Sequence, residues 1–483
     1  MRSFRTHRVA VVPSTSGGGV TSGFYADPYS AYATRLVDPS IASDVAGGTT
    51  LTRTWNGSSA SYQVYKTLAY AMTDWLTAGG RRLGLLQSAT YTLTSITSLP
   101  ASGSSDTARV IVQGDPAASA STMPLITGQY YIDASQSWAT FRKFRFENQT
   151  DAVYPGGIVV DGTTGAREGF VAEYLSFKNI TQPNGDKNIG AVAFDFMSQA
   201  MSAPPTVRYC KFDTIKLTTG SLIYSNQSGV YMDRAYRPHI HNNYFTNCAN
   251  AIRSKVAPEN SYSTSNPGGM HAHHNVIVDC AVSIGLGDAG NYDAGYFGDT
   301  FHHNLISSTV PYSGGFSLLN TEKQASGGTV IYNNTVYVNT GVEGAALGVN
   351  GFDVSVFRDN ALYMSNGYVW VLDNAYSYPS RIQTCDYNAY GGTASSLAFT
   401  PHGWSGPFIT TLAGWKGAYS GGNWSAALTQ DPDAHGFGIT SSAFTNLAGG
   451  DFTPAAGSPL LNAGSDGKNI GCYDGVNPVG PGW

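Results

Sequence analysis

Two cations lie close together on one short stretch of this chain, AIRSKV at Ala251–Val256. Arg253 and Lys255 are two residues apart, so both side chains point to the same side of an extended strand. Lysine is a general base when a neighbouring cation lowers its pKa, and arginine neutralises carboxylates. These groups suit β-elimination, in which a base removes the proton next to the carboxylate of a uronic acid. Arg234 and Arg237 are further candidates for neutralising that carboxylate.

Carboxylates near the same stretch allow a second chemistry. Hydrolysis of a glycosidic bond needs two carboxyl groups, about 5 Å apart for retention of configuration or up to about 9.5 Å apart for inversion. Glu259 could pair with Asp288, with Asp293 or with Asp233, which all lie near the cationic stretch in sequence. Such pairs are common by chance, so the carboxylates alone do not decide between elimination and hydrolysis.

Most of the histidines lie in the same part of the chain. Seven of the ten are His239, His241, His271, His273, His274, His302 and His303. Three of these share one position, two residues before a recurring asparagine, and are expected to stack on a strand surface: His241, His273 and His302. Such a stack could bind a transition metal or transfer protons, but we favour a structural stack of flat polar rings. His271 directly follows a long loop, and we expect it to overhang the functional face.

A repeat of about 30 residues must position these groups. An Asn-x-apolar motif recurs with gaps of 26 to 32 residues, at Asn243, Asn275, Asn304, Asn334, Asn360 and Asn388. Each unit alternates apolar and polar residues in short strands and shows no helical period. Strands this short are stable when each pairs with its equivalent in the next unit, about 4.8 Å away, as in a parallel β-solenoid. A propeller does not fit, because its blades need about 40–45 residues each.

The recurring asparagines predict a ladder of side-chain amides along one turn of the solenoid, where a left-handed backbone is favoured. Cys248 and Cys280 each lie five residues after their asparagine. We expect them to stack as small buried side chains and not to form a disulfide. The five cysteines include no CxxC pair, so the sequence indicates neither a zinc site nor a disulfide framework.

The strand that carries Arg253 and Lys255 has an equivalent in the other units. In register, these are Gly157–Gly162, Val192–Met197, Leu222–Gln227, Ala251–Val256, Ser283–Asp288, Phe316–Thr321, Ala346–Gly351 and Trp370–Ala375. Alternation points six residues into the core: Val192, Ile223, Ile252, Ile284, Leu318 and Leu347. The outward positions hold Asp195, Tyr224, Asn226, Arg253, Lys255, Gly285, Gly287, Asn350 and Asp373. Charge is scarce in the chain and is thus gathered on one outward face.

The long loops that leave this strand add polar and aromatic residues to the same face. We predict substrate-binding roles for Asp233, Arg234, Arg237, Tyr224, Asn226, Tyr262, Asp293, Tyr296 and Lys323. Gly285 and Gly287 are expected to leave a trough beside Lys255. A trough with tyrosines and mixed charge suits an extended carbohydrate, whose rings stack on aromatic side chains and whose hydroxyls form hydrogen bonds.

The composition fits an extracellular or virion-associated β-protein. Charged residues make up 12% of the chain, the net charge is −5 and there is no basic run, which argues against nucleic acid as a partner. Apolar residues make up 42%, with 57 glycines and 30 tyrosines, as in turn-rich β-structure. No segment approaches the roughly 20 apolar residues that cross a membrane. The first residues, MRSFRTHRVAVVPSTSGGG, do not form a clear signal peptide.

Both ends of the predicted solenoid have recognisable segments. Ser61–Gly80 contains one apolar helical face and is expected to form an amphipathic cap helix over the open core. Gly449–Asp474, GGDFTPAAGSPLLNAGSDGKNIGCYD, resembles the closing coil of right-handed parallel β-helix proteins of the pectate-lyase-like superfamily. The predicted cap helix and the strand after it resemble the opening of the same proteins. DPDAH at Asp431–His435 looks like a metal motif, but we favour a turn there.

The resemblance covers roughly residues 60–475 and implies the fold class: all-β, a single-stranded right-handed parallel β-helix with an N-terminal amphipathic cap helix. We expect residues 1–55 to form an irregular cap or attachment segment. Residues 56–400 are then the β-helix, and residues 401–483 its last coils and C-terminal cap.

The stretch Asn242–Asn260 resembles the lysine-bearing coil of β-helix alginate and chondroitin lyases. The resemblance implies that Lys255 is the base, that an arginine one rung further assists as acid, and that acidic residues hold calcium. This chain has no arginine on the next rung, and Asn250 and Ala251 stand where an acidic residue is expected. The family's calcium ligands are therefore not matched, and no cofactor is assigned. Tyr262, Tyr292 or a histidine would have to supply the acid.

We predict a polysaccharide lyase that acts on a uronate-containing polymer in a groove along the β-helix. The predicted catalytic residues are Lys255, Arg253, His271, Tyr292, Glu259 and Asp288. The alternative is a glycoside hydrolase of the phage-tailspike type that uses paired Asp and Glu residues, and the third reading is a non-catalytic glycan-binding or virion structural protein. The partner is a polysaccharide, and the protein is expected to be a monomer, or a homotrimer if it is a tailspike.

Overall fold

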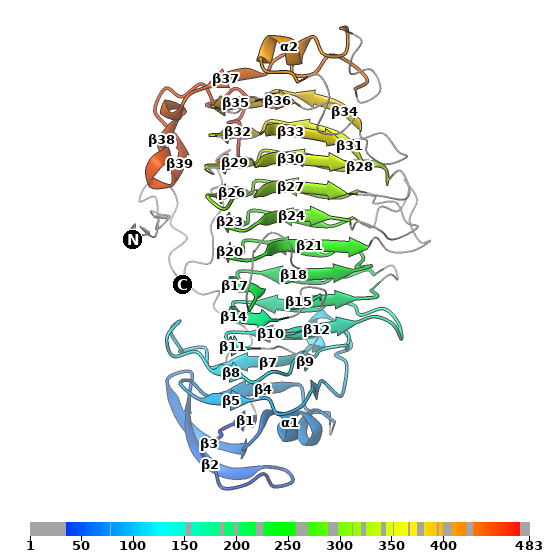
Figure 1. Ribbon diagram of the computed structural model, residues 1–483. Coiled ribbons are helices and arrows are strands. Elements are labelled where there is room, and N and C mark those ends of the chain that lie inside the picture. The colour runs from blue at the N-terminus through cyan, green and yellow to red at the C-terminus, as the bar shows by residue number, and fades with distance from the viewer. Residues whose placement is uncertain are drawn as a thin grey trace.

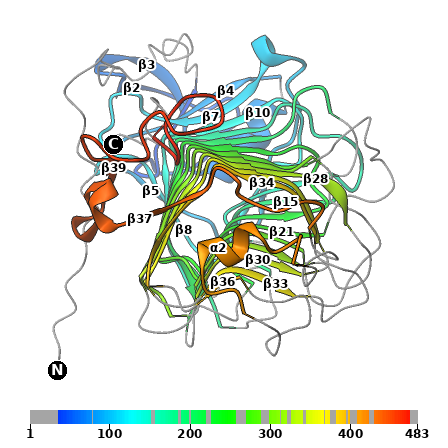
Figure 2. The same ribbon diagram turned by 90° about the horizontal axis from the view of Figure 1, so that it is seen from above.

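The computed structural model (Figure 1) describes residues 35–77, 79–150, 156–183, 188–197, 201–218, 226–256, 269–287, 298–311, 313–319, 325–339, 344–350, 352–365, 368–373, 381–393, 396–398, 408–421 and 428–473. In these residues the chain winds into an elongated coil of short strands that form three long sheets, here called A, B and C. Viewed along the coil, the sheets enclose one core (Figure 2).

Sheet A has 14 strands within the described residues, and all its pairs are parallel except the hairpin β2–β3. Its order is β2 (Thr49–Trp55), β3 (Ser58–Tyr65), β1 (Arg35–Val37), β4 (Arg82–Leu85), β7 (Val110–Gly114), β10 (Ala139–Arg142), β13 (Val171–Glu173), β16 (Thr206–Arg208), β19 (His239–His241), β22 (His271–His273), β25 (Thr300–His302), β28 (Ala325–Tyr332), β31 (Phe352–Arg358) and β34 (Arg381–Asp386).

Sheets B and C are parallel throughout their described strands. Sheet B runs β37 (Phe437–Ile439), β35 (Ala389–Gly392), β32 (Ala361–Met364), β29 (Thr335–Val338), β26 (Leu305–Ser308), β23 (Val276–Val278), β20 (Tyr244–Thr246), β17 (Lys211–Leu217), β14 (Ser176–Gln182), β11 (Arg145–Gln149), β8 (Leu125–Thr127) and β5 (Thr90–Thr92). Sheet C runs β36 (Ser396–Ala398), β33 (Tyr368–Asp373), β30 (Ala345–Asn350), β27 (Gly314–Leu319), β24 (Val282–Leu286), β21 (Asn250–Val256), β18 (Ser228–Asp233), β15 (Gly190–Asp195), β12 (Ile158–Asp161), β9 (Ile132–Asp133) and β6 (Thr97–Ser98).

Each rung of the coil contributes one strand to sheet A, one to sheet B and one to sheet C, in that order along the chain. Each strand pairs with its equivalents on the rungs above and below, so a strand too short to be stable alone belongs to a long sheet. The predicted fold class, an all-β right-handed parallel β-helix, is confirmed. The three-way division of the chain at residues 55 and 400 stays a prediction, although β1 and β2 of the first segment already belong to sheet A.

The ends of the coil carry the few helical turns of the described residues. A four-residue helix α1 (Leu68–Ala71) continues as a π-helical turn η2 (Met72–Leu76), and Leu68, Met72 and Leu76 are buried in the main core. This helix is shorter than predicted, because the first part of Ser61–Gly80 is strand β3. Its capping role stays a prediction. At the other end, α2 (Leu412–Lys416) places the fully buried Trp415 in the core (Figure 1).

The predicted asparagine ladder is present between sheets A and B. The Nδ2 atom of Asn243 donates to the Oδ1 atom of Asn275 at 3.1 Å. The same bond, at 3.0 Å, joins each further step of the series Asn275, Asn304, Asn334, Asn360 and Asn388. The left-handed residue is the one before each ladder asparagine, for example Asn242 with φ 57° and Asp359 with φ 58°. Every ladder asparagine is completely buried, so the amide ladder replaces hydration of these turns.

A carboxylate ends the ladder. The Oδ1 atom of Asp433 accepts hydrogen bonds from the backbone N–H of Asn388 at 3.1 Å and from its Nδ2 at 2.9 Å. The Oδ2 atom accepts from Trp415 Nε1 at 2.8 Å, from the Cys385 thiol at 3.0 Å and from the Tyr390 hydroxyl. Every asparagine donates towards the C-terminal end, so the last position needs a group that only accepts. The DPDAH motif thus supplies the end of the ladder.

The core residues of sheet C agree with the predicted alternation at all but one rung. Val192, Ile252, Ile284, Leu318 and Leu347 are buried in the main core. The prediction for Leu222–Gln227 is wrong, because the strand that pairs between β15 and β21 is β18. Both stretches alternate, but Val230 and Met232 fill the core where the earlier stretch offers a serine. Asn226 precedes the strand, and Ile223 and Tyr224 lie outside the described residues.

The last described residues, 437–473, fold back along the outer face of sheet B, and we call them the strap (Figures 1 and 2). The strap contains the 3-10 turns η5 (Ser441–Ala443) and η6 (Leu447–Gly449) and the hairpin of β38 (Phe444–Asn446) and β39 (Asp451–Pro454). The apolar side chains of the strap bury Val276, Leu305 and Ala361 of sheet B. The remaining 3-10 turn, η3 (Asp106–Ala108), lies near the other end of the coil.

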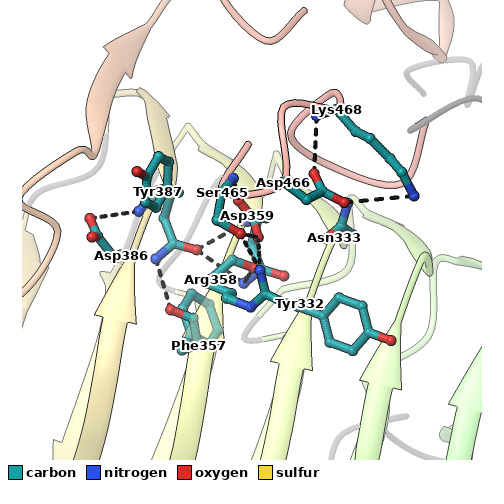
Figure 3. Close-up of polar contacts among 12 residues, drawn as sticks. Tyr332, Asn333, Phe357, Arg358, Asp359, Asp386, Tyr387, Ser465, Asp466 and Lys468 are labelled. Carbon is teal, nitrogen blue, oxygen red and sulfur yellow. Dashed lines mark hydrogen bonds and ion pairs between the residues drawn. The ribbon is translucent and has the colours of Figure 1, made fainter. Parts of the chain in front are cut away.

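The strap is also held by a polar clamp, shown in Figure 3. The carboxylate of Asp359 accepts from the backbone N–H and the hydroxyl of Ser465, each at 2.7 Å, and pairs with Arg358 at 2.9 Å. The backbone carbonyl of Asp359 accepts from Gly471 at 2.8 Å. The predicted closing coil is therefore a segment that covers sheet B and is anchored on one buried side chain.

Candidate functional site

The outer face of sheet C carries the residues that the sequence singles out. The backbone register places Val159, Ala193, Tyr231, Arg253 and Gly285 in one column along five successive rungs. The first three form a small outer apolar cluster, in which Tyr231 is completely buried. Arg253 follows on the next rung and donates to the Oδ1 atom of Asn250 at 3.4 Å. The column thus changes from apolar to cationic at β21.

A second outward column holds carboxylates. Asp161, Asp195 and Asp233 are in register on three successive rungs, at the ends of β12, β15 and β18. Asp195 is buried, and Asp233 forms an ion pair with Arg234 at 3.5 Å. The acidic column stops at the rung of β21, where the chain places Lys255.

Lys255 is the extra residue of a β-bulge. Met232 pairs with Ser254 and Asp233 pairs with Val256, so no residue of β18 pairs with Lys255 in the strand register. A bulge bends the strand and re-aims the side chain of its extra residue, and bulges occur often beside active sites. The sequence prediction placed Lys255 in a regular alternation and missed the bulge. A bulge places two residues of one strand opposite one residue of the neighbouring strand, so it cannot be recognised from the sequence of one strand alone.

The rung after Lys255 leaves room on the outer face. A β-carbon added to Gly285 would lie 3.2 Å from Val282 Cγ1, with no other atom closer than 3.9 Å. Gly348, two rungs further in the same column, would place a β-carbon 3.9 Å from its nearest neighbour. Gly287 has a φ of 87°, which favours glycine. The predicted trough thus has space beside Arg253 at Gly285.

The corner from sheet C to sheet A holds the two other predicted arginines. Arg234 and Arg237 both have left-handed backbones, with φ values of 56° and 45°. Arg234 lies over the ring of Phe196 at 4.9 Å and beside Asp233, which fixes its guanidinium. Arg237 is half-buried and directly precedes Pro238.

Two histidines stand at the start of sheet A strands beyond this corner. His239 and His271 are in register on β19 and β22, with ring centroids 5.0 Å apart. Burial, then His271, His241 and Arg237, lower the pKa of His239 to about 4. Burial and Arg237 also lower the pKa of His271. Both imidazoles are therefore neutral at neutral pH, which makes His271 poorly suited to be the general acid.

The predicted site residues thus divide into two sets. The structure brings Arg253, Lys255, Asp233, Arg234, Arg237 and His271 to neighbouring rungs on sheet C and its corner with sheet A. The following predicted residues lie outside the described residues: Tyr224, Glu259, Tyr262, Asp288, Tyr292, Asp293, Tyr296 and Lys323. Their roles stay predictions. Asp161 and Asp195 lie in register on sheet C, and His239 lies on sheet A. The sequence predicts an outward Asp195 and groups His239 with the other histidines without a role for either, and Asp161 is missed although the aligned stretch Gly157–Gly162 contains it.

The other histidines form the predicted stack on sheet A. His241, His273 and His302 stack with centroids 4.8 Å apart at each step, and Tyr332 continues the stack at 4.9 Å. Nδ1 atoms of neighbouring rings are paired, His273 with His274 at 2.9 Å and His302 with His303 at 2.7 Å. In the part of the chain that the structure describes, no three His, Cys, Asp or Glu side chains are placed to hold a metal ion. The geometry therefore favours the structural reading of this stack.

The cysteines also agree with the prediction. All five are buried and free, and Cys248 and Cys280 interact as neighbouring thiols. Burial raises the pKa of Cys280 well above its ordinary value.

No helix among the described residues is long and apolar enough to cross a membrane.

Comparison with known proteins finds similarity among solved structures only. No protein-family profile matches the chain, and no curated protein matches it. A PL6 family polysaccharide lyase from Pseudopedobacter saltans aligns with a TM-score of 0.45 and 10% identity, over 84% of this chain and 98% of that one. Tailspike protein 3 of bacteriophage CBA120 gives 0.30 and 11%, over 71% and 51%. Pectate lyase II from Xanthomonas campestris gives 0.24 and 13%, over 72% and 82%. These values assign no role to any residue here.

Proposed function

We propose that this protein is a polysaccharide lyase that cleaves a uronate-containing polymer by β-elimination on the outer face of sheet C. The observation that carries the proposal is the β-bulge at Lys255, because the column of carboxylates ends at this rung and the bulge adds an amine two residues after Arg253. A uronate carboxylate would be repelled by the rungs of Asp195 and Asp233 and attracted to the rung of Arg253 and Lys255.

In the proposed reaction, Arg253 neutralises the carboxylate of the sugar and so acidifies the hydrogen on the adjacent carbon. The unprotonated amine of Lys255 takes this proton. The electron pair of the C–H bond forms a carbon–carbon double bond, and the bond from the neighbouring carbon to the glycosidic oxygen breaks. Since His271 is neutral at neutral pH, the leaving oxygen takes its proton from water in this scheme. The products are an unsaturated uronate end and a new hydroxyl end.

The experiment is digestion of a panel of uronate polysaccharides, with product detected by the ultraviolet absorbance of the unsaturated sugar. Lys255→Ala should lower kcat by about 10²–10⁴, the usual contribution of a general base. Lys255→Arg should be equally impaired, because guanidinium keeps the charge and does not lose its proton at neutral pH. Lys178→Ala is the matched control, since this lysine lies on β14 of sheet B and its side chain is 51% exposed. Full activity in Lys255→Ala would remove the proposed base.

A second candidate is glycoside hydrolysis by Asp195 and Asp233. Their rungs are adjacent, and strands one rung apart are separated by about 4.8 Å. Retaining glycosidases hold their two carboxyl groups about 5–5.5 Å apart. New reducing ends without an unsaturated product, abolished by Asp233→Asn, would favour this candidate. Binding of a polysaccharide without either product would leave the glycan-binding reading.

A further inference from the structure

Arg237 differs from four other arginines on sheets A and C and on the corner between them. Arg208, Arg234, Arg253 and Arg358 interact with Glu173, Asp233, Asn250 and Asp359. Within the described residues, no hydrogen bond or ion pair is found for Arg237, although its Nε atom is buried. Removal of an arginine Nε–H from water without a partner is unfavourable. A half-buried cation of this kind is prepared for an acceptor that is not part of the described chain.

The backbone of Arg237 is also strained. Its φ of 45° is uncommon for a residue with a β-carbon, and a residue before proline normally takes an extended conformation. Arg237 lies in the connection from β18 of sheet C to β19 of sheet A, the strand that opens the rung of Lys255. Strained residues of this kind cluster at ligand-binding sites, where the surrounding structure holds them in place.

The groups next to Arg237 are neutral hydrogen-bonding rings. Arg237 lies two residues before His239, which stacks on His271 with ring centroids 5.0 Å apart, and Arg237 lowers the pKa of both imidazoles. The Nε2 atom of His239 is buried and has no hydrogen-bond partner among the described residues. Neutral imidazoles still donate an N–H each, so the cluster offers one charge and two directional donors.

We propose that Arg237, His239 and His271 form a subsite for an oxyanion, a carboxylate or a sulfate, on a sugar next to the one that Lys255 attacks. This inference rests on the proposed function and deepens it. His239 begins the rung that ends with Lys255, and His271 begins the next rung. On sheet C, the two rungs before Lys255 carry Asp195 and Asp233, which repel an anion, so the subsite is placed at the corner with sheet A.

The substrate class follows from this placement. A polymer bound at both places needs one anionic group for Arg253 on sheet C and a second for the subsite at the corner with sheet A. A polymer with anionic groups on neighbouring sugars supplies both.

The subsite is tested without turnover, by following the imidazole resonances of the histidines by NMR during titration with sodium sulfate and, separately, with sodium glucuronate. Ionic strength is held constant with sodium chloride. Saturable shifts are expected at His239 and His271 and not at His302 and His303, whose Nδ1 atoms are already paired. Saturation with sulfate alone assigns the subsite to sulfate esters, and saturation with glucuronate assigns it to carboxylates. Shifts that are linear in both anions would overturn the proposal.

Arg237→Met should abolish the saturable shifts, while Lys178→Met should preserve them. Arg237→Lys, which keeps the charge, should retain them with weaker affinity and so separates anion binding from a folding defect. In activity assays Arg237→Met should raise KM about tenfold on a polymer charged at every sugar. Saturable shifts without lyase product would remove the proposed function and keep the subsite. Lyase product with an unaltered KM in Arg237→Met would remove the subsite alone.

Discussion

The end of the asparagine ladder allows a quantitative test of the architecture. Asp433 is completely buried and accepts five hydrogen bonds, two from Asn388 and one each from Trp415, Cys385 and Tyr390. Asp433→Ala leaves these donors without their acceptor. The backbone N–H of Asn388 and the Nε1–H of Trp415 cannot rotate to another partner, whereas the hydroxyl and the thiol can. The amide of Asn388 loses its bond in the same way as the last member of the ladder.

The magnitude follows from these contacts. Each buried donor left unsatisfied costs about 1–3 kcal/mol, and Asp433→Ala leaves the backbone N–H of Asn388 and the Nε1–H of Trp415 without an acceptor. We therefore expect Asp433→Ala to lower the free energy of unfolding by about 4 kcal/mol. Asp433→Asn keeps one oxygen for Asn388 but turns an amino group towards Trp415 Nε1, so about 2 kcal/mol is expected.

The assay is urea unfolding at neutral pH, followed by tryptophan fluorescence and by circular dichroism so that local and global transitions are compared. Asp431→Asn is the control, because this carboxylate lies in the same motif and is exposed. The expected order of stability is wild type, then Asp433→Asn, then Asp433→Ala. If Asp433→Ala unfolds within about 0.5 kcal/mol of the wild type, the ladder does not need an acceptor at its end.

Four further outcomes are expected. Asp359→Ala should free the strap and speed limited proteolysis after Pro454, because the buried Asp359 carboxylate anchors Ser465, whereas Asp466→Ala in the exposed loop should not. Stability should fall as pH drops below about 6.5, since burial and His302 lower the pKa of His273 to about 2 while the unfolded chain takes up the proton near 6.5; a His273→Gln variant should show a shallower fall in urea titrations. Asp299→Asn should stabilise the protein at about pH 8 and not at about pH 4, because burial raises the pKa of this carboxyl from 3.8 to about 7 and its ionisation opposes folding above that pH. The same difference in unfolding free energy between variant and wild type at both pH values would contradict this expectation. Gly285→Phe should fill the trough and weaken polysaccharide binding in affinity electrophoresis, with a small fall in the unfolding midpoint because a β-carbon there lies 3.2 Å from Val282 Cγ1, which must shift.

The architecture could be predicted from local sequence patterns alone. The asparagine motif recurs once per rung, and each rung contacts only its neighbours, so the turn chemistry that is correct for one rung is correct for the next. The same local repetition predicted the stack of His241, His273 and His302 and the free thiols of Cys248 and Cys280. It also predicted that Arg253 faces outward, in the column of Val159, Ala193 and Tyr231, because side-chain direction along a strand has a period of two residues.

The alignment of the rungs and the places where the repeat is broken depend on contacts between distant parts of the chain. Two alternating stretches compete for the rung below β21, and β18 is selected because Val230 and Met232 fill the core. Lys255 is a bulge only by comparison with its neighbouring strand, so its own sequence does not mark it. Asp433 ends the ladder from 45 residues beyond Asn388. Register, bulges and ladder ends depend on which distant residues meet, and the local pattern of apolar and polar residues carries no record of that choice.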